Sequence, residues 1–181
     1  PRDYYPGLYS VLVYPRAFWV DLEEPDEAGM AHPDEAREGE AWSTGAIVLS
    51  WEDIETDLKR FNSRNVVLHE FAHWLLEFGG PQDVPQLLDD PHLRDEWHAV
   101  MLTHYEQHVR AVQWGDDALF DAYGAESEAE FFAVLTEAFF EQPVKMRRNA
   151  RALYAQLCRY YRQDPALYFT RPDQDAEMPD A

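Results

Sequence analysis

Residues 65–76 read NVVLHEFAHWLL. Asn65 is a suitable helix N-cap and Gly79-Gly80 is a stop signal, so the run between them predicts one helix. Outside the pattern His-Glu-x-x-His the run is apolar on almost every side, which predicts that the helix is buried. Two imidazoles and a carboxylate are costly in a buried helix unless a partner satisfies them. The stretch therefore predicts a buried helix with a polar site at its middle.

The polar residues of this helix have the spacing of metal ligands. Residues four apart lie one turn above each other on the same helix face, so His69 and His73 can direct their imidazoles at one ion. Glu70 lies beside that face, where its carboxylate can reach a water on the metal without being a ligand. The alternative is a pair of core histidines that ordinary hydrogen bonds satisfy. Burial of the surrounding helix favours the metal site.

The two histidines supply only two ligands, whereas a catalytic zinc site has three protein ligands and an open position for water. No third histidine follows shortly after His73. Glu130 and Glu137 lie seven residues apart in a second apolar run, residues 127–140, which predicts a helix. Ser127 and Glu130 also match a capping box, in which Glu130 would only reach back to the helix start. The residues alone leave the choice between the two carboxylates open.

The remaining sequence predicts a few strands among several helices. Runs of β-branched and apolar residues predict strands, and apolar residues at helical spacing predict helices. Strands are expected at residues 10–14 and 45–51, with 17–20 as a continuation, helices at 51–61, 91–114, 143–149 and 150–162, and a loop over the site at 79–91.

The chain is expected to form one domain, residues 1–169, followed by a polar tail, residues 170–181. Residues 21–40 are acidic and interrupted by proline and glycine. Such a composition predicts a surface excursion within the domain. No internal repeat and no second domain is visible in the sequence.

A second histidine pair, on the helix predicted for residues 91–114, also has metal-ligand spacing. His104 and His108 are four residues apart, but Glu106 stands at the wrong position for the pattern His-Glu-x-x-His. We interpret this pair as part of a solvated helix face.

The composition is strongly acidic, with 35 Asp and Glu against 15 Lys and Arg and a formal net charge of −20 in 181 residues. Nucleic acid is not expected as a partner, because phosphate binding needs clustered basic side chains. No apolar run approaches the ~18 residues of a membrane span, so a membrane partner is not expected either. The single cysteine, Cys158, excludes an internal disulfide and favours a reducing compartment, so we expect a cytoplasmic protein.

Several motifs together resemble one protein family. The motif HEFAH, with Tyr123 seven residues before Glu130 and EFFAV beginning at Glu130, resembles the MtfA (Mlc titration factor A) family of zinc peptidases. The spacing of the Tyr and the Glu is also similar to that in the catalytic domain of anthrax lethal factor, a related gluzincin. The resemblance covers nearly the whole chain and extends through YPGL at 5–8, SVLVYP at 10–15, IVLSW at 47–51, NVVL at 65–68 and YYRQDP at 160–165.

The resemblance implies a fold and a metal site. The fold would be α+β and zincin-like, with a small twisted sheet and a dominant helical layer that carries the HExxH helix and a later Glu-bearing helix. The site would hold Zn²⁺ between His69, His73 and Glu130. Glu137 is a candidate for orienting one ligand histidine through its free ring nitrogen.

The resemblance also implies a reaction on a peptide or protein substrate. Glu70, with a pKa raised by its apolar helix, would take a proton from water and deliver it to the leaving amine. The Tyr123 hydroxyl would stabilise the charge of the tetrahedral intermediate. Without the resemblance, Tyr123 is interpreted as a packing residue. The substrate would lie extended against an exposed strand edge, residues 47–50.

Two functions are consistent with the sequence. The first is a zinc-dependent peptidase, with aminopeptidase action on short peptides as the form that the family suggests. The second is a regulatory binding module with little or no catalysis, because the family's namesake sequesters a transcriptional repressor. The complete set of site residues favours the enzyme. The chain departs from the family at Leu76, where an Asp is usual, and it begins at the equivalent of the catalytic core, without the N-terminal helical segment of most members.

Overall fold

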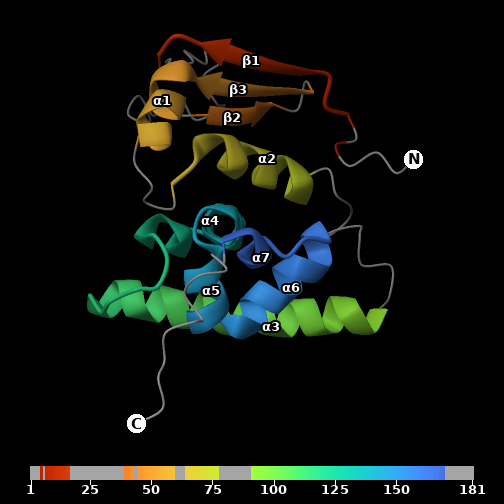
Figure 1. Cartoon of the computed structure of the whole chain (residues 1–181), viewed down its shortest axis with the longest axis vertical. Helices are drawn as coiled ribbons and strands as arrows, with labels where there is room; N and C mark the ends of the chain where they lie inside the picture. Colours follow the sequence, from red (N-terminus) through yellow and green to blue (C-terminus); the bar gives the residue numbers. More distant parts are fainter. Residues whose placement is uncertain are drawn as a thin grey trace, which may run out of the picture.

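The fold is α+β and layered, with a small sheet at one end of the molecule and helices stacked beneath it (Figure 1). The structure is a computed structural model that describes residues 5, 7–16, 39–42, 45–59, 64–77 and 91–169. Its elements are, in chain order, β1 (Ser10–Tyr14), β2 (Gly39–Trp42), β3 (Ala46–Ser50), α1 (Trp51–Lys59), α2 (Val66–Glu77), α3 (Pro91–Trp114), the 3-10 helix η1 (Ala122–Ala125), α4 (Glu128–Glu141), α5 (Pro143–Asn149), α6 (Arg151–Tyr161) and α7 (Ala166–Phe169). Helix α2 lies directly under the sheet, α4 lies beneath α2, and α3 forms the opposite side of the stack (Figure 1).

The described sheet has three strands in the order β1-β3-β2, so β3 is its central strand. β1 runs parallel to β3, and β2 runs antiparallel to it. The side chains of β3 from Ile47 to Ser50 are all buried, which explains the unbroken apolar run in its sequence. The prediction that residues 47–50 form an exposed edge is therefore wrong, because both sides of this strand are paired. The edges of the described sheet belong to β1 and β2.

Strand β2 is not predicted by the sequence. Gly39 and Glu40 end an acidic run without β-branched residues, and pairing with β3 supplies what local propensity does not. The strand begins inside the excursion predicted for residues 21–40. The rest of that excursion lies outside the described residues, as does the strand continuation predicted at 17–20.

Helix α2 is held against the sheet by one face. Trp74 is fully buried with Ile47 and Leu49 of β3, and the side chains of Val67 and Phe71 pack against this cluster. The opposite face of α2 is thereby presented to α4.

The first turn of α2 is fixed by side-chain hydrogen bonds. The Asn65 side-chain oxygen accepts a hydrogen bond from the N–H of Leu68 at 3.1 Å, so the predicted N-cap is confirmed. The Asp57 carboxylate of α1 accepts from the N–H of Val66 at 2.8 Å. These bonds set the position of the residues that follow, beginning with His69.

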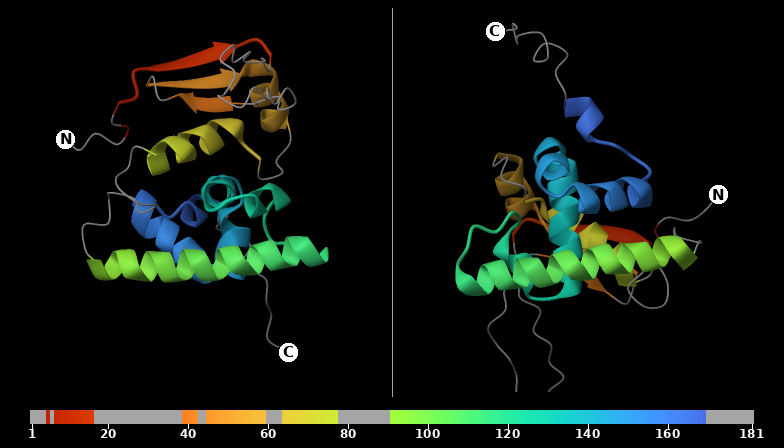
Figure 2. Two further views of the ribbon diagram at one scale, coloured as in Figure 1. Left: turned by 180° about the vertical axis from the view of Figure 1, so that it is seen from behind. Right: turned by 90° about the horizontal axis from the view of Figure 1, so that it is seen from below.

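Helix α4 is the centre of the helical layer. Its residues 131–139 are all buried, and six of them belong to one apolar cluster with side chains of α3 and α6. Helix α3 has the bounds predicted from the sequence and runs across α4 (Figure 2). Trp97 of α3 lies edge-on to Phe132 of α4, with ring centroids 6.0 Å apart. A polar group between residues 131 and 139, such as the Glu137 carboxylate, is therefore set in a packed core.

Among the described helices, none is both long enough and apolar enough to cross a membrane. Residues 78–90 and 170–181, where a loop and a polar tail are expected, lie outside the described residues.

Candidate metal centre

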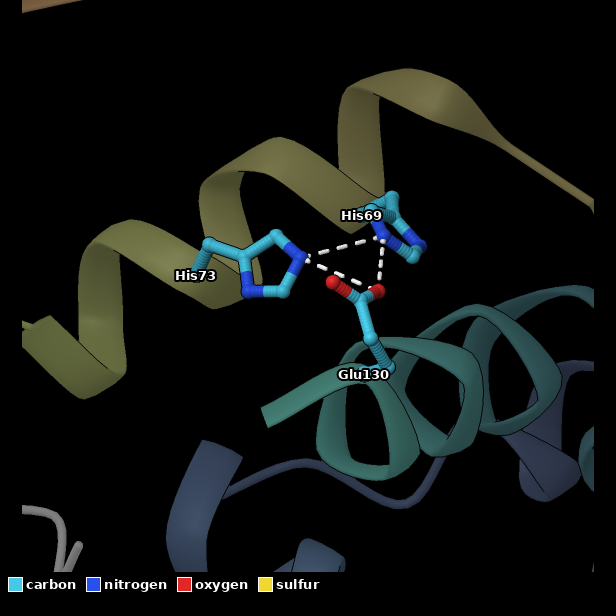
Figure 3. Close-up of side chains that lie close together, drawn as sticks. All are labelled: His69, His73 and Glu130. Carbon is cyan, nitrogen blue, oxygen red and sulfur yellow. Dashed lines mark hydrogen bonds and ion pairs between the residues drawn. The ribbon is translucent and has the colours of Figure 1, made fainter. Parts of the chain in front are cut away.

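Three side chains from two helices meet where α2 faces α4 (Figure 3). Nε2 of His69 lies 3.1 Å from Nε2 of His73, one turn further along α2. Oε2 of Glu130, on α4, lies 2.9 Å from Nε2 of His69 and 3.3 Å from Nε2 of His73. One donor atom from each residue lies within 4.8 Å of the other two, and all three side chains are half-buried. His69, His73 and Glu130 thus form a triad that could hold a metal ion.

Glu130 uses its backbone and its side chain differently. Its N–H donates to the Ser127 side-chain oxygen at 3.1 Å, so half of the predicted capping box is present. Its carboxylate faces the histidines of α2 and does not serve only to close the helix start. The cap by Ser127 is therefore compatible with a Glu130 carboxylate directed at the histidines.

Glu137 lies about two turns further along α4 and contacts the other side of His69. Its Oε1 accepts a hydrogen bond from Nδ1 of His69 at 2.7 Å, and its Oε2 accepts from the N–H of Asn65 at 2.5 Å. Glu137 is 3% exposed. Glu141, one turn on, accepts from the side-chain amide of Asn65 at 2.8 Å. With Nδ1 of His69 bonded to Glu137, Nε2 of the same ring faces the other members of the triad.

The charges of the triad compensate each other. Burial lowers the pKa of His69, but hydrogen bonds with Glu130 and Glu137 outweigh it and raise this pKa to about 9. Burial raises the pKa of Glu130, but hydrogen bonds with His69 and His73 lower it to about 2. Burial also raises the pKa of Glu137, against the effect of its bond with His69. At neutral pH the protonated His69 ring and the ionised Glu130 carboxylate thus balance each other, and the positive charge of His69 lies where a metal cation would carry it.

Glu70 follows His69 on α2 and is only 6% exposed. On the helix it belongs to the face next to that of the two histidines. Its action on a water beside the ion stays a prediction.

Tyr123 is carried by η1, the single turn that precedes α4. Its ring centroid lies 5.8 Å from that of His69, and its side chain is half exposed. The Asp121 carboxylate accepts from the N–H of Tyr123 at 2.9 Å and caps the turn. The role of Asp121 is not among the predictions from the sequence, although an Asp two residues before the N–H that it binds is a typical turn signal.

The second histidine pair does not form a solvated face. His108 is 6% exposed, and its Nε2 donates to the carbonyl oxygen of Asp121 at 3.0 Å. Its ring stacks on Phe131 with centroids 5.3 Å apart. Burial lowers the pKa of both His104 and His108. The interpretation as a solvated face is wrong for His108, because this side of α3 packs against α4 and η1.

Comparison with known proteins identifies relatives over most of the chain. The family described as glucose-regulated metallo-peptidase M90 matches residues 1–162. An uncharacterized protein of Synechocystis is 36% identical over 90% of this chain and 60% of its own length. Mlc titration factor A of Yersinia enterocolitica is 35% identical over 94% of this chain and 65% of its own length. Mlc titration factor A of Yersinia pestis is 38% identical over 91% of this chain and 62% of its own length. The chain therefore spans 60–65% of the length of these curated relatives.

Proposed function

The chain belongs to the glucose-regulated metallo-peptidase M90 family, which is the family of Mlc titration factor A, and on this premise we propose that it is a zinc-dependent peptidase. The observation that carries the proposal is the triad of His69, His73 and Glu130. We further propose that residues 1–169 form one zincin-like catalytic domain. A cytoplasmic location belongs to the same proposal, supported by the free thiol of the single cysteine, Cys158.

The donor atoms of the triad suit zinc in type and in spacing. Two imidazole nitrogens and one carboxylate oxygen are a frequent ligand set of catalytic zinc sites, which keep a fourth position open. Bonds of ~2.0–2.2 Å at tetrahedral angles place ligand atoms about 3.3–3.6 Å apart. The three distances between donor atoms of the triad are 2.9, 3.1 and 3.3 Å. A tetrahedral ion therefore fits with small adjustments.

Zinc bound to the triad would supply Lewis acidity, which polarises a scissile carbonyl group and makes a water easier to deprotonate. Glu70 would accept the proton of the attacking water and pass it to the leaving amine. The Tyr123 hydroxyl would donate a hydrogen bond to the oxyanion, which the nearness of its ring to His69 supports. Glu137 would keep Nε2 of His69 directed at the ion through its bond to Nδ1.

Strand β2 is the proposed place for a peptide substrate. It pairs with β3 on one side, and no other strand in the described parts of the chain pairs with its outer edge. It also contacts α2, the helix that carries the two histidines (Figure 1). A peptide added to this edge would satisfy its backbone groups with those of β2. Removal of residues from the amino end of short peptides is the form of the activity to test first.

A second candidate function is regulatory protein binding. Relatives of this chain are named Mlc titration factor A, a name that refers to another protein, Mlc. In this chain the partner would be a transcriptional repressor, bound with little or no catalysis. A binding module has no need of a buried carboxylate beside the triad, so the presence of Glu70 favours the enzyme.

The variant Glu70→Gln separates the two functions. We expect about one zinc per chain in both the wild type and the variant by elemental analysis, and a ~10²–10⁴-fold loss of peptide hydrolysis in the variant, the typical effect of removing a general base. Glu106→Gln changes an exposed carboxylate of α3 and is the matched control, with wild-type activity expected. Protein that does not take up zinc on titration, or a Glu70→Gln variant that still cleaves, would overturn the enzyme proposal.

A further inference from the structure

His108 is a buried histidine of α3. It contacts both η1, which carries Tyr123, and α4, which carries Glu130. Its ring stacks on Phe131, the residue after Glu130, with planes at 30°. Its Nε2 donates to the carbonyl oxygen of Asp121, the residue at the start of η1. The proposed chemistry assigns no role to this hydrogen-bonded side chain.

The hydrogen bond from His108 fixes the residue that in turn fixes the backbone of Tyr123. The carbonyl oxygen of Asp121 accepts from Nε2 of His108 at 3.0 Å and from the N–H of Gly124 at 3.1 Å. The side chain of Asp121 accepts from the N–H of Tyr123 at 2.9 Å. Because η1 is a single turn, the position of Asp121 sets the direction in which Tyr123 leaves the backbone.

The turn also lies close to the imidazole of His108 at Gly124. A Cβ atom added at Gly124 would lie 3.3 Å from Nε2 of His108 and 3.4 Å from Cβ of Val134. A side chain at this position would therefore be in tight contact with His108, and either the imidazole or η1 would have to shift by a few tenths of an ångström. The ring of His108 thus both donates a hydrogen bond to η1 and lies close to it at Gly124.

We propose that His108 is a positioning residue for Tyr123: through its hydrogen bond to Asp121 and its contact with Gly124, it holds η1 so that the Tyr123 ring stays beside His69. The inference rests on the proposed function of Tyr123 as a donor to the oxyanion. A residue that only filled space would supply the contact but not the hydrogen bond, and this difference can be tested.

Two substitutions of His108 separate the hydrogen bond from the packing. His108→Leu removes the donor and keeps an apolar side chain, whereas His108→Gln keeps an N–H at a similar reach. We expect kcat for peptide hydrolysis to fall ~10–100-fold in the Leu variant, as for a displaced catalytic group, and to recover in the Gln variant. KM and zinc content should be unchanged. His104→Leu, one turn earlier on α3, is the matched control, with wild-type kcat expected.

A double-mutant cycle tests the link to Tyr123. In the Tyr123→Phe background, His108→Leu should cause no further loss of kcat, because the group that it positions is already gone. An equal loss in both backgrounds, or a Gln variant as impaired as the Leu variant, would overturn the proposal. If His108→Leu does not fold, Gly124→Ala disturbs the contact between His108 and the same turn and should lower kcat with the same dependence on Tyr123.

Amide hydrogen exchange of η1 gives a readout that does not need activity. Exchange at Tyr123 and Gly124 should be about tenfold faster in His108→Leu, the effect of losing roughly one hydrogen bond, and should return in His108→Gln. Unchanged exchange would overturn the positioning role even where the enzyme proposal stands. If exchange is faster in His108→Leu but Tyr123→Phe keeps the wild-type kcat, His108 does position η1, and the catalytic role of Tyr123 is contradicted.

Discussion

Oε1 of Glu137 lies 2.7 Å from Nδ1 of His69, while the other oxygen of the same carboxylate accepts a hydrogen bond from the backbone N–H of Asn65. One buried side chain of α4 therefore fixes both a ring of the triad and the start of the helix that carries it. Glu137 is the link between the helical core and the candidate metal centre.

Replacing Glu137 by Gln should weaken zinc binding without removing a ligand. Glu137 meets these two donors with two different oxygens, and an amide replaces one of the oxygens by an NH2 group, so either Nδ1 of His69 or the N–H of Asn65 would face another donor. Loss of such an orienting group typically lowers metal affinity ~10–100-fold, which competition with a chromophoric chelator measures. Glu141→Gln is the matched control, because the carboxylate of Glu141 accepts a hydrogen bond from the side chain of Asn65 and an amide oxygen can keep this bond. Wild-type affinity in Glu137→Gln would contradict the orienting role.

Removing the metal should lower the thermal stability of the protein. A ligand that binds only the folded state at 1,000 times its Kd stabilises it by about 4 kcal/mol. For a chain of this size that corresponds to a decrease in Tm of roughly 8–16 °C when a chelator is added. Calorimetry with and without chelator measures the shift. The double variant His69→Ala, His73→Ala should show none, and a shift that persists there would place the metal elsewhere.

The metal-stripped protein should lose stability as the pH rises from 6.5 to about 9. The pKa of His69 is about 9 against an ordinary value of 6.5, so its contribution is complete below pH 6.5 and lost as the pH rises through about 9. Glu130 acts in the opposite sense, since its pKa is about 2 against 4.5: its contribution is present above pH 4.5 and lost as the pH falls through about 2. Urea denaturation at a series of pH values measures both. In His69→Gln the alkaline loss should disappear, and an unchanged alkaline profile would refute the assignment.

Replacing Ser127 by Ala should cost about 1 kcal/mol of unfolding free energy, the usual effect of losing a helix N-cap. The N–H of Glu130 would lose the oxygen that accepts its hydrogen bond at 3.1 Å. Urea denaturation at neutral pH measures the loss. Ser127→Asp keeps an acceptor and should stay close to the wild type, whereas equal losses in the two variants would show that the cap is not the cause.

The helix with the two histidines could be predicted because its signals lie within a short stretch of chain. Asn65 caps it, the apolar residues around the motif bury it, and the four-residue spacing brings Nε2 of His69 within 3.1 Å of Nε2 of His73. The same reasoning gives the bounds of α3, residues 91–114. In both cases local hydrogen bonds and the helical period decide the structure.

The remaining features depend on tertiary placement. Glu130 and Glu137 lie on the same side of α4, and which ring nitrogen of His69 each of them meets depends on how far α4 is shifted along α2. The burial of His108 depends on η1, which no period in α3 reveals. Strand β2 exists because β3 is available as a partner. The family resemblance selected Glu130 over Glu137 as the third ligand, where the spacing of the residues could not.

The carboxylates of α4 reach His69 across long stretches of chain, 61 residues for Glu130 and 68 for Glu137. Because α4 is buried from residue 131 to 139, it takes its place only when the helical core closes. Before that, a folding chain offers a metal the two nitrogens of α2, fewer than the three ligands of a catalytic site. Zinc should therefore slow unfolding and leave the refolding rate unchanged. Unlike the zinc of a small finger domain, the ion would stabilise a completed fold without guiding its formation.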